Sequence, residues 1–154
     1  MTAAAAITVG GRRVLGQGCE CKVYDFSPRK VLKLYRSKSE AREAFEAQKA
    51  VHAAGYAPKA YEVVELKGRP LFTERWHHQR DAYPLVSGYV SQKARPLVQA
   101  VGWGRADEFV EQMENIVDFV EDRTGVFMGN DIHTGNLGMI ARRCVFIDFG
   151  ECSL

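Results

Sequence analysis

The chain has 154 residues, of which 46% are hydrophobic and 26% charged, and its formal net charge is +2. This length fits one domain with a buried core, and the composition is that of an ordinary globular protein. A net charge this small argues against nucleic acid or a membrane surface as the partner. No apolar run approaches the roughly 18 residues of a membrane span, and the first residues lack the basic start of an export signal. We therefore expect a cytoplasmic protein.

Basic residues and cysteines are spread thinly along the chain. We interpret the three basic doublets as solvated residues of turns: Arg12-Arg13, Arg29-Lys30 and Arg142-Arg143. The four cysteines lack the Cys-x-x-Cys pairs of a structural zinc site: Cys19, Cys21, Cys144 and Cys152. Reduced thiols are the expectation for a protein without an export signal, and a redox or metal role is the less favoured alternative.

The first half of the chain predicts a small sheet and one helix. Residues 6–35 form three short strands. The first runs from 7–9 through Gly10-Gly11 to 14–15, the second covers 22–26 and the third covers 31–35. A helix follows over about 38–54, because Ser37 and Glu40 form a capping-box pattern and Gly55 ends it. Two further strands, at about 60–67 and 70–76, flank a hairpin turn at Lys67-Gly68.

The second half predicts a linker, a long helix and three short apolar pieces. Residues 77–104 mix polar and aromatic residues with Pro84 and Pro96, which indicates a linker with short helical pieces. A helix over about 106–123 carries one buried stripe, formed by Phe109, Met113, Ile116, Val117 and Val120. After Gly125 come apolar pieces at 126–128, 137–140 and 144–147.

Two features near the start could contact phosphates. Gly16-x-Gly18 lies between two strands, and Val23 opens the second of them; glycines let backbone N–H groups approach an anion closely. Lys33 is a lone cation inside the apolar strand 31–35. Such a lysine either extends its ammonium past a sheet edge or meets an anion. The helix that follows offers a counter-ion, for which we favour Glu46, with Glu43 as the fallback and Glu40 as a third candidate.

The most specific pattern lies near the end of the chain. Asp131-Ile132-His133-Thr134-Gly135-Asn136 is a polar segment between apolar pieces, and Asp148-Phe149-Gly150 follows twelve residues after the Asn. Mg²⁺ prefers hard oxygen ligands and keeps some of its waters, so a carboxylate and an amide oxygen next to phosphates suffice to hold it. A further carboxylate can accept a hydroxyl proton from an attacking group. Two such turns therefore indicate a magnesium-phosphate site.

These motifs together resemble the protein kinase superfamily, and most closely its atypical and small-molecule branch. That branch includes aminoglycoside phosphotransferases, lipopolysaccharide kinases and RIO-type kinases, whose catalytic loop typically has the pattern Asp-x-His-x-Gly-Asn. The resemblance implies that Asp131 is the catalytic base, that Asn136 and Asp148 bind Mg²⁺, and that Lys33, paired with Glu46, contacts the ATP phosphates. It further implies that Gly16 and Gly18 cover the phosphates with Val23 beside them, and that a hinge containing Glu74 and Trp76 contacts the adenine.

The fold implied by the resemblance is α+β and kinase-like. It has an N-lobe over 1–76, a hinge or linker over 77–104 and a truncated C-lobe over 105–154. The N-lobe is a five-stranded antiparallel sheet with one αC-type helix, and the C-lobe is reduced and mainly helical. The sequence departs from the family at three points: Cys21 replaces a third glycine, Gly129-Asn130 stand where a His is usual, and His133 stands where Ser/Thr protein kinases have a lysine.

Only four residues follow Gly150, so we expect the acceptor-binding part of the family's C-lobe to be missing. A homodimer or a protein partner would then complete the lobe. The leading hypothesis is an ATP- and Mg²⁺-dependent kinase that transfers the γ-phosphoryl group to a hydroxyl of a protein or small-molecule acceptor. The alternative is a kinase-like binding module that acts by docking on a protein partner. Reduced chains resembling this family are often met in bacteria and their viruses, which is consistent with a bacterial or phage-infected cytoplasm.

Overall fold

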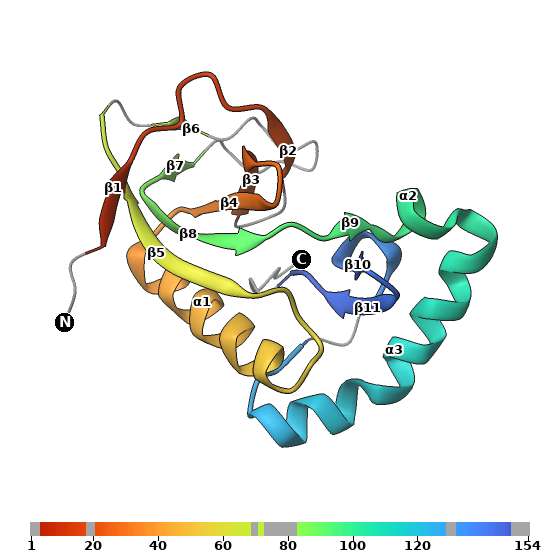
Figure 1. Cartoon of the computed structure of the whole chain (residues 1–154). Coiled ribbons are helices and arrows are strands. Elements are labelled where there is room, and N and C mark those ends of the chain that lie inside the picture. Colours follow the sequence, from red (N-terminus) through yellow and green to blue (C-terminus); the bar gives the residue numbers. More distant parts are fainter. Residues whose placement is uncertain (1–3, 18–20, 69–70, 73–82, 129–131, 149–154) are drawn as a thin grey trace. The chain divides into compact units, whose positions relative to one another are not determined.

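The computed structural model describes residues 4–17, 21–68, 71–72, 83–128 and 132–148 (Figure 1). Its longest elements are a 16-residue helix and a 22-residue helix. In chain order the elements are β1 (Ala5–Ile7), β2 (Val14–Gln17), β3 (Cys21–Ser27), β4 (Lys30–Tyr35), α1 (Lys38–Ala53), β5 (Ala60–Leu66), β6 (Leu71–Phe72), β7 (Pro84–Leu85), β8 (Ser87–Gln92), β9 (Arg95–Pro96), α2 (Leu97–Val101), α3 (Trp103–Thr124), the 3-10 helix η1 (Thr134–Asn136), β10 (Leu137–Ile140) and β11 (Arg143–Phe146).

The described residues form two compact units. Unit 1 consists of those up to Phe45 together with those from Ala60 to Gln92, and unit 2 consists of 46–59 and those from Lys93 onward. Helix α1 contributes its first half to unit 1 and its second half to unit 2. The fold class is therefore α+β, with most of the strands in unit 1 and α2 and α3 in unit 2.

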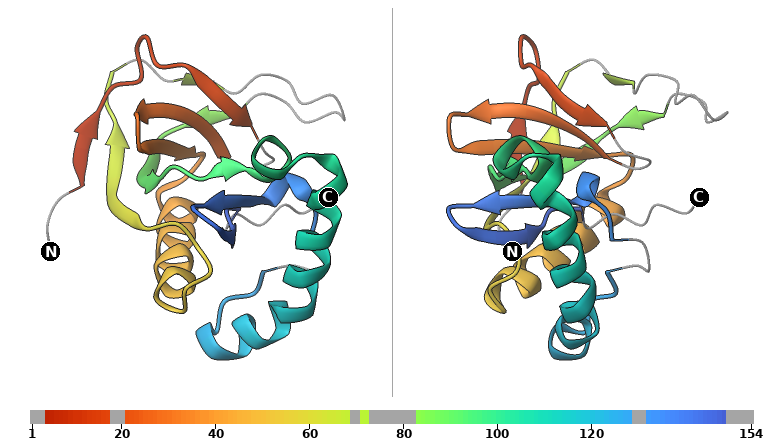
Figure 2. Two further views of the ribbon diagram at one scale, coloured as in Figure 1. Left: turned by 45° about the vertical axis from the view of Figure 1, so that its right-hand side comes forward. Right: turned by 90° about the vertical axis from the view of Figure 1, so that its right-hand side faces the viewer.

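Unit 1 is built on a six-stranded mixed sheet. The strand order is β1-β5-β8-β4-β3-β2, with β1 and β2 at the two edges (Figures 1 and 2). All neighbouring strands are antiparallel except β1 and β5, which pair in parallel with Ile7 opposite Leu66. The predicted five-stranded antiparallel sheet is thus wrong in strand number and in the direction of one edge strand. Strand β1 also ends at Ile7, where the sequence analysis expected 7–9.

The largest correction concerns the residues expected to form a linker. Ser87–Gln92 is strand β8, which lies between β4 and β5 in the middle of the sheet. The predicted hairpin at Lys67-Gly68 is also wrong, because β5 pairs with β8 while Leu71–Phe72 pairs with Pro84–Leu85 in a separate two-stranded sheet. The remainder of the predicted strand 70–76 lies outside the described residues.

One face of the unit 1 sheet packs a hydrophobic core, because the strands alternate. Leu32 and Leu34 on β4 are fully buried and belong to one cluster with Tyr24, Val64 and Val90. Lys33 and Tyr35, which alternate with them, point to the opposite face. Helix α1 packs on that opposite face, where Phe45 meets Tyr89 edge-on with ring centroids 5.6 Å apart.

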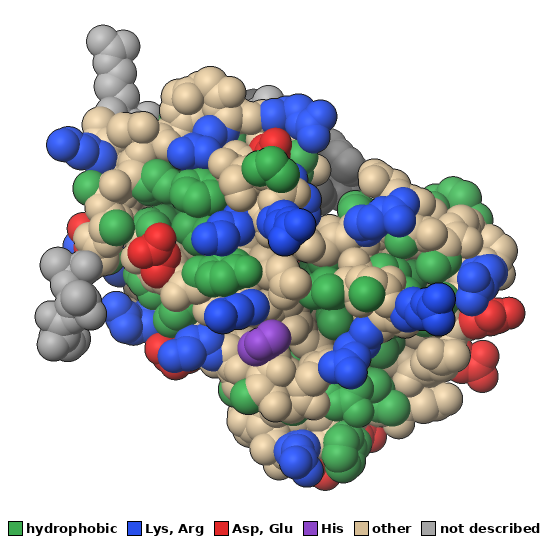
Figure 3. Space-filling model, viewed as in Figure 1, with side chains coloured by type: hydrophobic (Ala, Val, Ile, Leu, Met, Phe, Trp, Pro, Cys, Tyr) green, Lys and Arg blue, Asp and Glu red, His purple; other side chains and the backbone are tan. Residues whose placement is uncertain are grey.

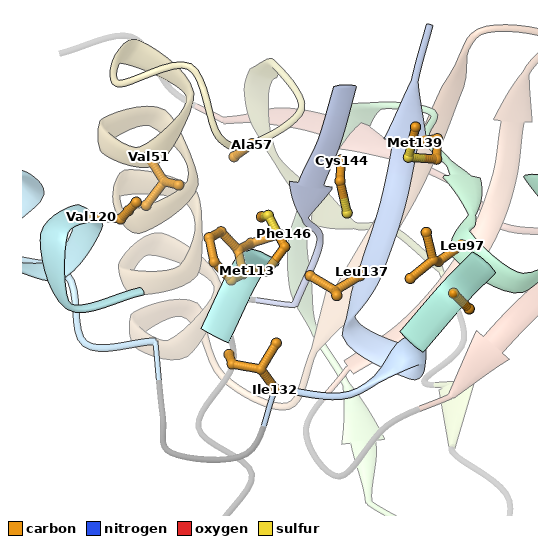
Figure 4. Close-up of a cluster of buried hydrophobic side chains, with 11 residues drawn as sticks. Val51, Ala57, Leu97, Met113, Val120, Ile132, Leu137, Met139, Cys144 and Phe146 are labelled. Atoms are coloured by element: carbon orange, nitrogen blue, oxygen red, sulfur yellow. The ribbon is translucent and has the colours of Figure 1, made fainter. Parts of the chain in front are cut away.

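Unit 2 encloses a second core around the β10–β11 hairpin (Figure 4). Helix α3 contributes Met113 and Val120 to this core, and the hairpin contributes Leu137 and Phe146. Strand β9 adds to the open side of β10, which gives a three-stranded antiparallel sheet. The predicted helices at 38–54 and 106–123 are confirmed at Lys38–Ala53 and Trp103–Thr124.

Helix α3 ends at a well-defined cap. Gly125 adopts a φ of 72°, in the left-handed region that favours glycine, and its N–H bonds to the Glu121 carbonyl. The Thr124 hydroxyl donates to the Val120 carbonyl at 2.7 Å and accepts from the Val126 amide at 3.2 Å. The Glu121 carboxylate accepts from the Met128 amide at 2.9 Å. These hydrogen bonds hold the backbone of residues 124–128 against the end of α3.

Candidate functional site

The unit 1 sheet places three of the predicted phosphate-site residues in one row. Gly16 on β2 is the register partner of Val23 on β3, Val23 is the partner of Lys33 on β4, and Lys33 is the partner of Tyr89 on β8. Directly opposed residues of neighbouring strands point to the same face of a sheet. The row therefore brings a glycine of the Gly-x-Gly segment and the lone lysine onto one face, although 17 positions separate them in the sequence.

Lys33 is the buried cation of this row. Its side chain is only 6% exposed, and its ammonium lies over the Tyr89 ring, 5.6 Å from the centroid. Tyr89 is itself fully buried and stacks on Tyr35 at 5.9 Å, while Phe45 of α1 closes the edge of its ring. A buried ammonium needs compensating contacts, and an aromatic face supplies part of that compensation. The Lys33 ammonium thus packs against a buried aromatic ring.

Gly88 fixes the spacing between β4 and β8, the two central strands of the unit 1 sheet. A Cβ built on Gly88 would overlap the carbonyl oxygen of Lys33 and would lie 2.9 Å from Leu34 Cδ2. The clash is mainly with backbone, so a side-chain movement cannot relieve it. Only glycine lets β8 approach β4 at this point, which makes Gly88 a positioning residue for Lys33.

The predicted glutamate partners of Lys33 lie off the buried face of α1. The buried stripe of that helix is formed by Ala41, Ala44, Phe45, Gln48 and Val51. Glu43 and Glu46 are exposed, and Glu40 accepts from the Arg36 guanidinium at 2.9 Å. Glu46 belongs to the part of α1 in unit 2, whereas Lys33 belongs to unit 1. The pairing of Lys33 with Glu46 stays a prediction.

Unit 2 holds Asn136 in a tight polar turn. The His133 Nδ1 accepts from the Gly135 amide at 3.0 Å, and the Asn136 Oδ1 accepts from the His133 amide at 3.2 Å. This reciprocal arrangement caps η1. Ile132, which lies just before this turn, is only 6% exposed and belongs to the unit 2 core (Figure 4). The amide oxygen of Asn136 therefore has a fixed orientation.

The β10–β11 hairpin brings the two predicted metal ligands close together in the fold. Leu137 pairs with Phe146, and the Ile147 amide then donates to the Asn136 carbonyl at 3.0 Å. Asp148 directly follows Ile147, so the twelve-residue separation between Asn136 and Asp148 closes to adjacent backbone positions at one end of the hairpin. An amide and a carboxylate at such a point have the oxygen chemistry that Mg²⁺ prefers.

Four predicted site residues fall outside the described residues: Gly18, Glu74, Trp76 and Asp131. Within the described part of the chain there is no group of three or more His, Cys, Asp or Glu side chains placed to hold a metal ion. Asn136 and Asp148 could bind Mg²⁺ only together with phosphate oxygens or water, as the sequence analysis expected.

The sequence analysis missed two residues that shape the site, Tyr89 and Gly88, and one buried polar residue of α1, Gln48. Tyr89 and Gly88 lie in the segment interpreted as a linker, where no alternating pattern marks a strand. Gln48 is the fully buried polar residue of α1, and its Nε2 donates to the Pro58 carbonyl at 2.9 Å. Its position was detectable, because it falls on the helical stripe that continues from Ala41 through Phe45.

Cys144 lies buried in the unit 2 core and carries a perturbed thiol. Burial raises the pKa of Cys144 from 9.0 to about 11, against a smaller lowering effect of a hydrogen bond with the Val145 backbone. A thiol with such a high pKa stays protonated and unreactive near neutral pH. Its place in the core gives Cys144 a packing role.

The sequence matches no known family model and no curated protein. Among the described residues, no helix is long and apolar enough to cross a membrane. The functional interpretation therefore rests on the geometry of the two units and on the motifs.

Proposed function

We propose that this chain is a kinase-like phosphotransferase that binds ATP with Mg²⁺ and transfers the γ-phosphoryl group to a hydroxyl of a protein or small-molecule acceptor. The observation that carries the proposal is the end of the β10–β11 hairpin in unit 2. There the Ile147 amide donates to the Asn136 carbonyl, so the backbone at Asp148 lies next to the backbone at Asn136. The amide and carboxylate oxygens of these two residues suit a magnesium ion that also binds phosphate. Asp131, at the head of the same segment, is the proposed base.

Unit 1 supplies the second line of support. Lys33 lies on the third strand of the β2–β3–β4 meander, in one row with Gly16 and Val23, and helix α1 follows that strand directly. Kinases hold the ATP phosphates with a glycine-rich turn and a lysine on the third strand, followed by a helix. In this proposal the Lys33 ammonium, buried over Tyr89, balances the charge of the α- and β-phosphates.

The proposal also revises the adenine-binding segment. The expectation for Glu74 and Trp76 rested on a fifth sheet strand that ends near them. The strand that completes the sheet is β8, and the chain passes from unit 1 to unit 2 directly after it, at Gln92 and Lys93. We therefore place the backbone that contacts the adenine edge in the segment after Gln92.

A transfer assay with matched variants tests the proposed function. The purified chain is incubated with γ-labelled ATP, Mg²⁺ and a cell lysate, and labelled products are measured. Lys33 is the proposed phosphate contact and Asp148 the proposed Mg²⁺ ligand, so Lys33→Met and Asp148→Ala should each reduce labelling by about 100-fold or more. Glu108→Ala, an exposed site on α3, should leave labelling unchanged. Equal labelling by wild type and both site variants would refute the proposal.

The alternative function is a kinase-like module that docks on a protein partner. Three large hydrophobic side chains of unit 2 favour it: Trp103 is 72% exposed, Phe119 54% and Phe127 70%. Apolar groups of this size at a surface often mark a protein contact. Isolation of a stoichiometric partner whose binding is unaffected by Lys33→Met and Asp148→Ala, but lost in Phe127→Ser, would favour this alternative.

A further inference from the structure

Two basic doublets that are far apart in the sequence come together in unit 1. The Arg13 carbonyl accepts from the Asp25 amide at 2.8 Å, and an Arg12 Nη1 donates to the Phe26 carbonyl at 3.1 Å. The chain then turns, and Lys30 pairs with Ser27 at the start of β4. Four cations therefore gather at one end of the β2–β3–β4 meander. We call this group the basic end: Arg12, Arg13, Arg29 and Lys30.

Two cations of the basic end are exposed and the other two are half-buried against aromatic rings. The Arg12 guanidinium lies 4.5 Å from the centroid of the Phe26 ring, and the Lys30 ammonium lies 4.4 Å from the centroid of the Tyr61 ring. Each of these two cations therefore forms a cation–π contact. Arg13 and Arg29 are exposed. Among the described residues, the ion pairs of unit 1 involve Arg36 and Lys38 and none of these four cations. Lys and Arg side chains, in blue, reach the surface of unit 1 in the upper part of Figure 3.

Helix α3 of unit 2 carries the opposite charge. It has seven acidic side chains against two arginines, Arg105 and Arg123. Five of the acids recur at helical spacing on one exposed face, at i, i+4, i+7, i+11 and i+15. We call these five the acidic stripe: Asp107, Glu111, Glu114, Asp118 and Asp122. The stripe is about 22 Å long, and within the described part of the chain none of its carboxylates forms an ion pair.

We propose that the basic end of one copy of this chain docks on the acidic stripe of a second copy. The two surfaces are complementary in charge, and within the described residues neither is neutralised by ion pairs in its own unit. The stripe lies on helix α3, and the basic end lies at turns that backbone hydrogen bonds and strand pairing hold together. Repulsion among five carboxylates along one helix face is relieved when four cations approach it. The contact joins two different surfaces, so it is heterologous and can continue from copy to copy or close into a ring. It does not depend on nucleotide binding.

A second copy fits these observations better than a nucleic acid does. A nucleic-acid partner would leave the acidic stripe without a role, and the net charge of the chain is only +2. The ring of Tyr61 is also covered on one face by the Lys30 ammonium, which removes that face as a stacking platform for a base.

Complementary charge reversal tests this docking. In variant A the basic end is reversed by Arg12→Glu and Arg13→Glu, and in variant B the acidic stripe is reversed by Asp118→Lys and Asp122→Lys. Each variant alone should associate about 100-fold more weakly than wild type, because like charges then face each other. An equimolar mixture of A and B should associate again, because the acidic stripe of A meets the basic end of B. A control with Arg42→Glu and Lys67→Glu, at exposed sites elsewhere on unit 1, should associate like wild type.

Sedimentation velocity across a range of protein concentrations measures the association. Wild type should form larger species at low ionic strength and dissociate as added salt screens the charges. A wild-type protein that stays monomeric at every concentration and salt level would overturn the proposal, as would a mixture of A and B that fails to associate. Binding of a labelled single-stranded oligonucleotide by monomeric wild type, lost in variant A, would also overturn it and would assign the basic end to nucleic acid.

Discussion

Replacing Gly88 with alanine tests how the central strands are held together. The added Cβ would overlap the carbonyl oxygen of Lys33, and its other near neighbour is Leu34 Cδ2 at 2.9 Å. Overpacked core positions usually lose about 1–3 kcal/mol, and a backbone clash belongs at the upper end of that range. We therefore expect a loss of about 3 kcal/mol. In a chain of this size that loss lowers the thermal midpoint by roughly 6–12 °C.

Differential scanning calorimetry measures this change against a matched glycine. Gly104 lies in α3, and a Cβ added there would meet only open space, so Gly104→Ala should stabilise the protein by up to about 1 kcal/mol. Because β4 must move away from β8 in Gly88→Ala, this variant should also bind ATP more weakly than wild type. A Gly88→Ala protein that melts at or above the wild-type temperature would refute the account of the β4–β8 contact.

Two further predictions concern the unit 2 core. Phe146→Ala should cost about 3–5 kcal/mol in unfolding free energy, whereas Phe119→Ala, at a half-exposed site, should change it little; urea denaturation compares the two. The Cys144 thiol, with a pKa of about 11, should resist iodoacetamide at pH 7 in the folded protein while the partly exposed Cys21 reacts. Since folding raises this pKa above 9.0, the thiol favours the folded state below pH 9, and this contribution should disappear as the pH rises through 11. Rapid Cys144 labelling, seen by peptide mass spectrometry, would contradict its burial.

The sequence predicted the elements whose signals are local. A capping-box pattern and Gly55 marked α1, and a periodic apolar stripe marked α3, which was placed within three residues at its start and one at its end. Strands β3 and β4 were also predicted, since the expected bounds 22–26 and 31–35 lie within Cys21–Ser27 and Lys30–Tyr35. The apolar pieces at 137–140 and 144–147 were recognised, but their pairing as a hairpin was not predicted.

Strand β8 escaped detection because it is buried on both faces. Ser87, Gly88 and Ser91 carry no hydrophobic signal, yet Ser87 and Ser91 are buried. Their hydroxyls find partners within the sheet, since Ser87 donates to the Val64 carbonyl at 3.0 Å and Ser91 to the Gln92 carbonyl at 3.1 Å. A central strand built from small polar residues shows no period-two alternation. The parallel pairing of β1 with β5 is equally hidden, because it joins segments nearly 60 residues apart.

The sequence indicated candidate site residues but not how the fold arranges them. The row of Gly16, Val23 and Lys33 depends on strand register, which local sequence does not specify. The basic end was missed for the same reason. The doublets Arg12-Arg13 and Arg29-Lys30 are separated in the sequence, and strand pairing brings them to one end of the meander. Strand register and the turns between the strands place these four residues close together.

Calorimetric titration of ATP into the protein, with and without Mg²⁺, tests the central claim most directly. The account predicts binding that Mg²⁺ strengthens, with this enhancement lost in Asp148→Ala and retained in Glu108→Ala. ATP binding that is absent under both conditions, or that is identical in wild type and Asp148→Ala, would contradict the proposed binding of Mg²⁺ and ATP by this chain.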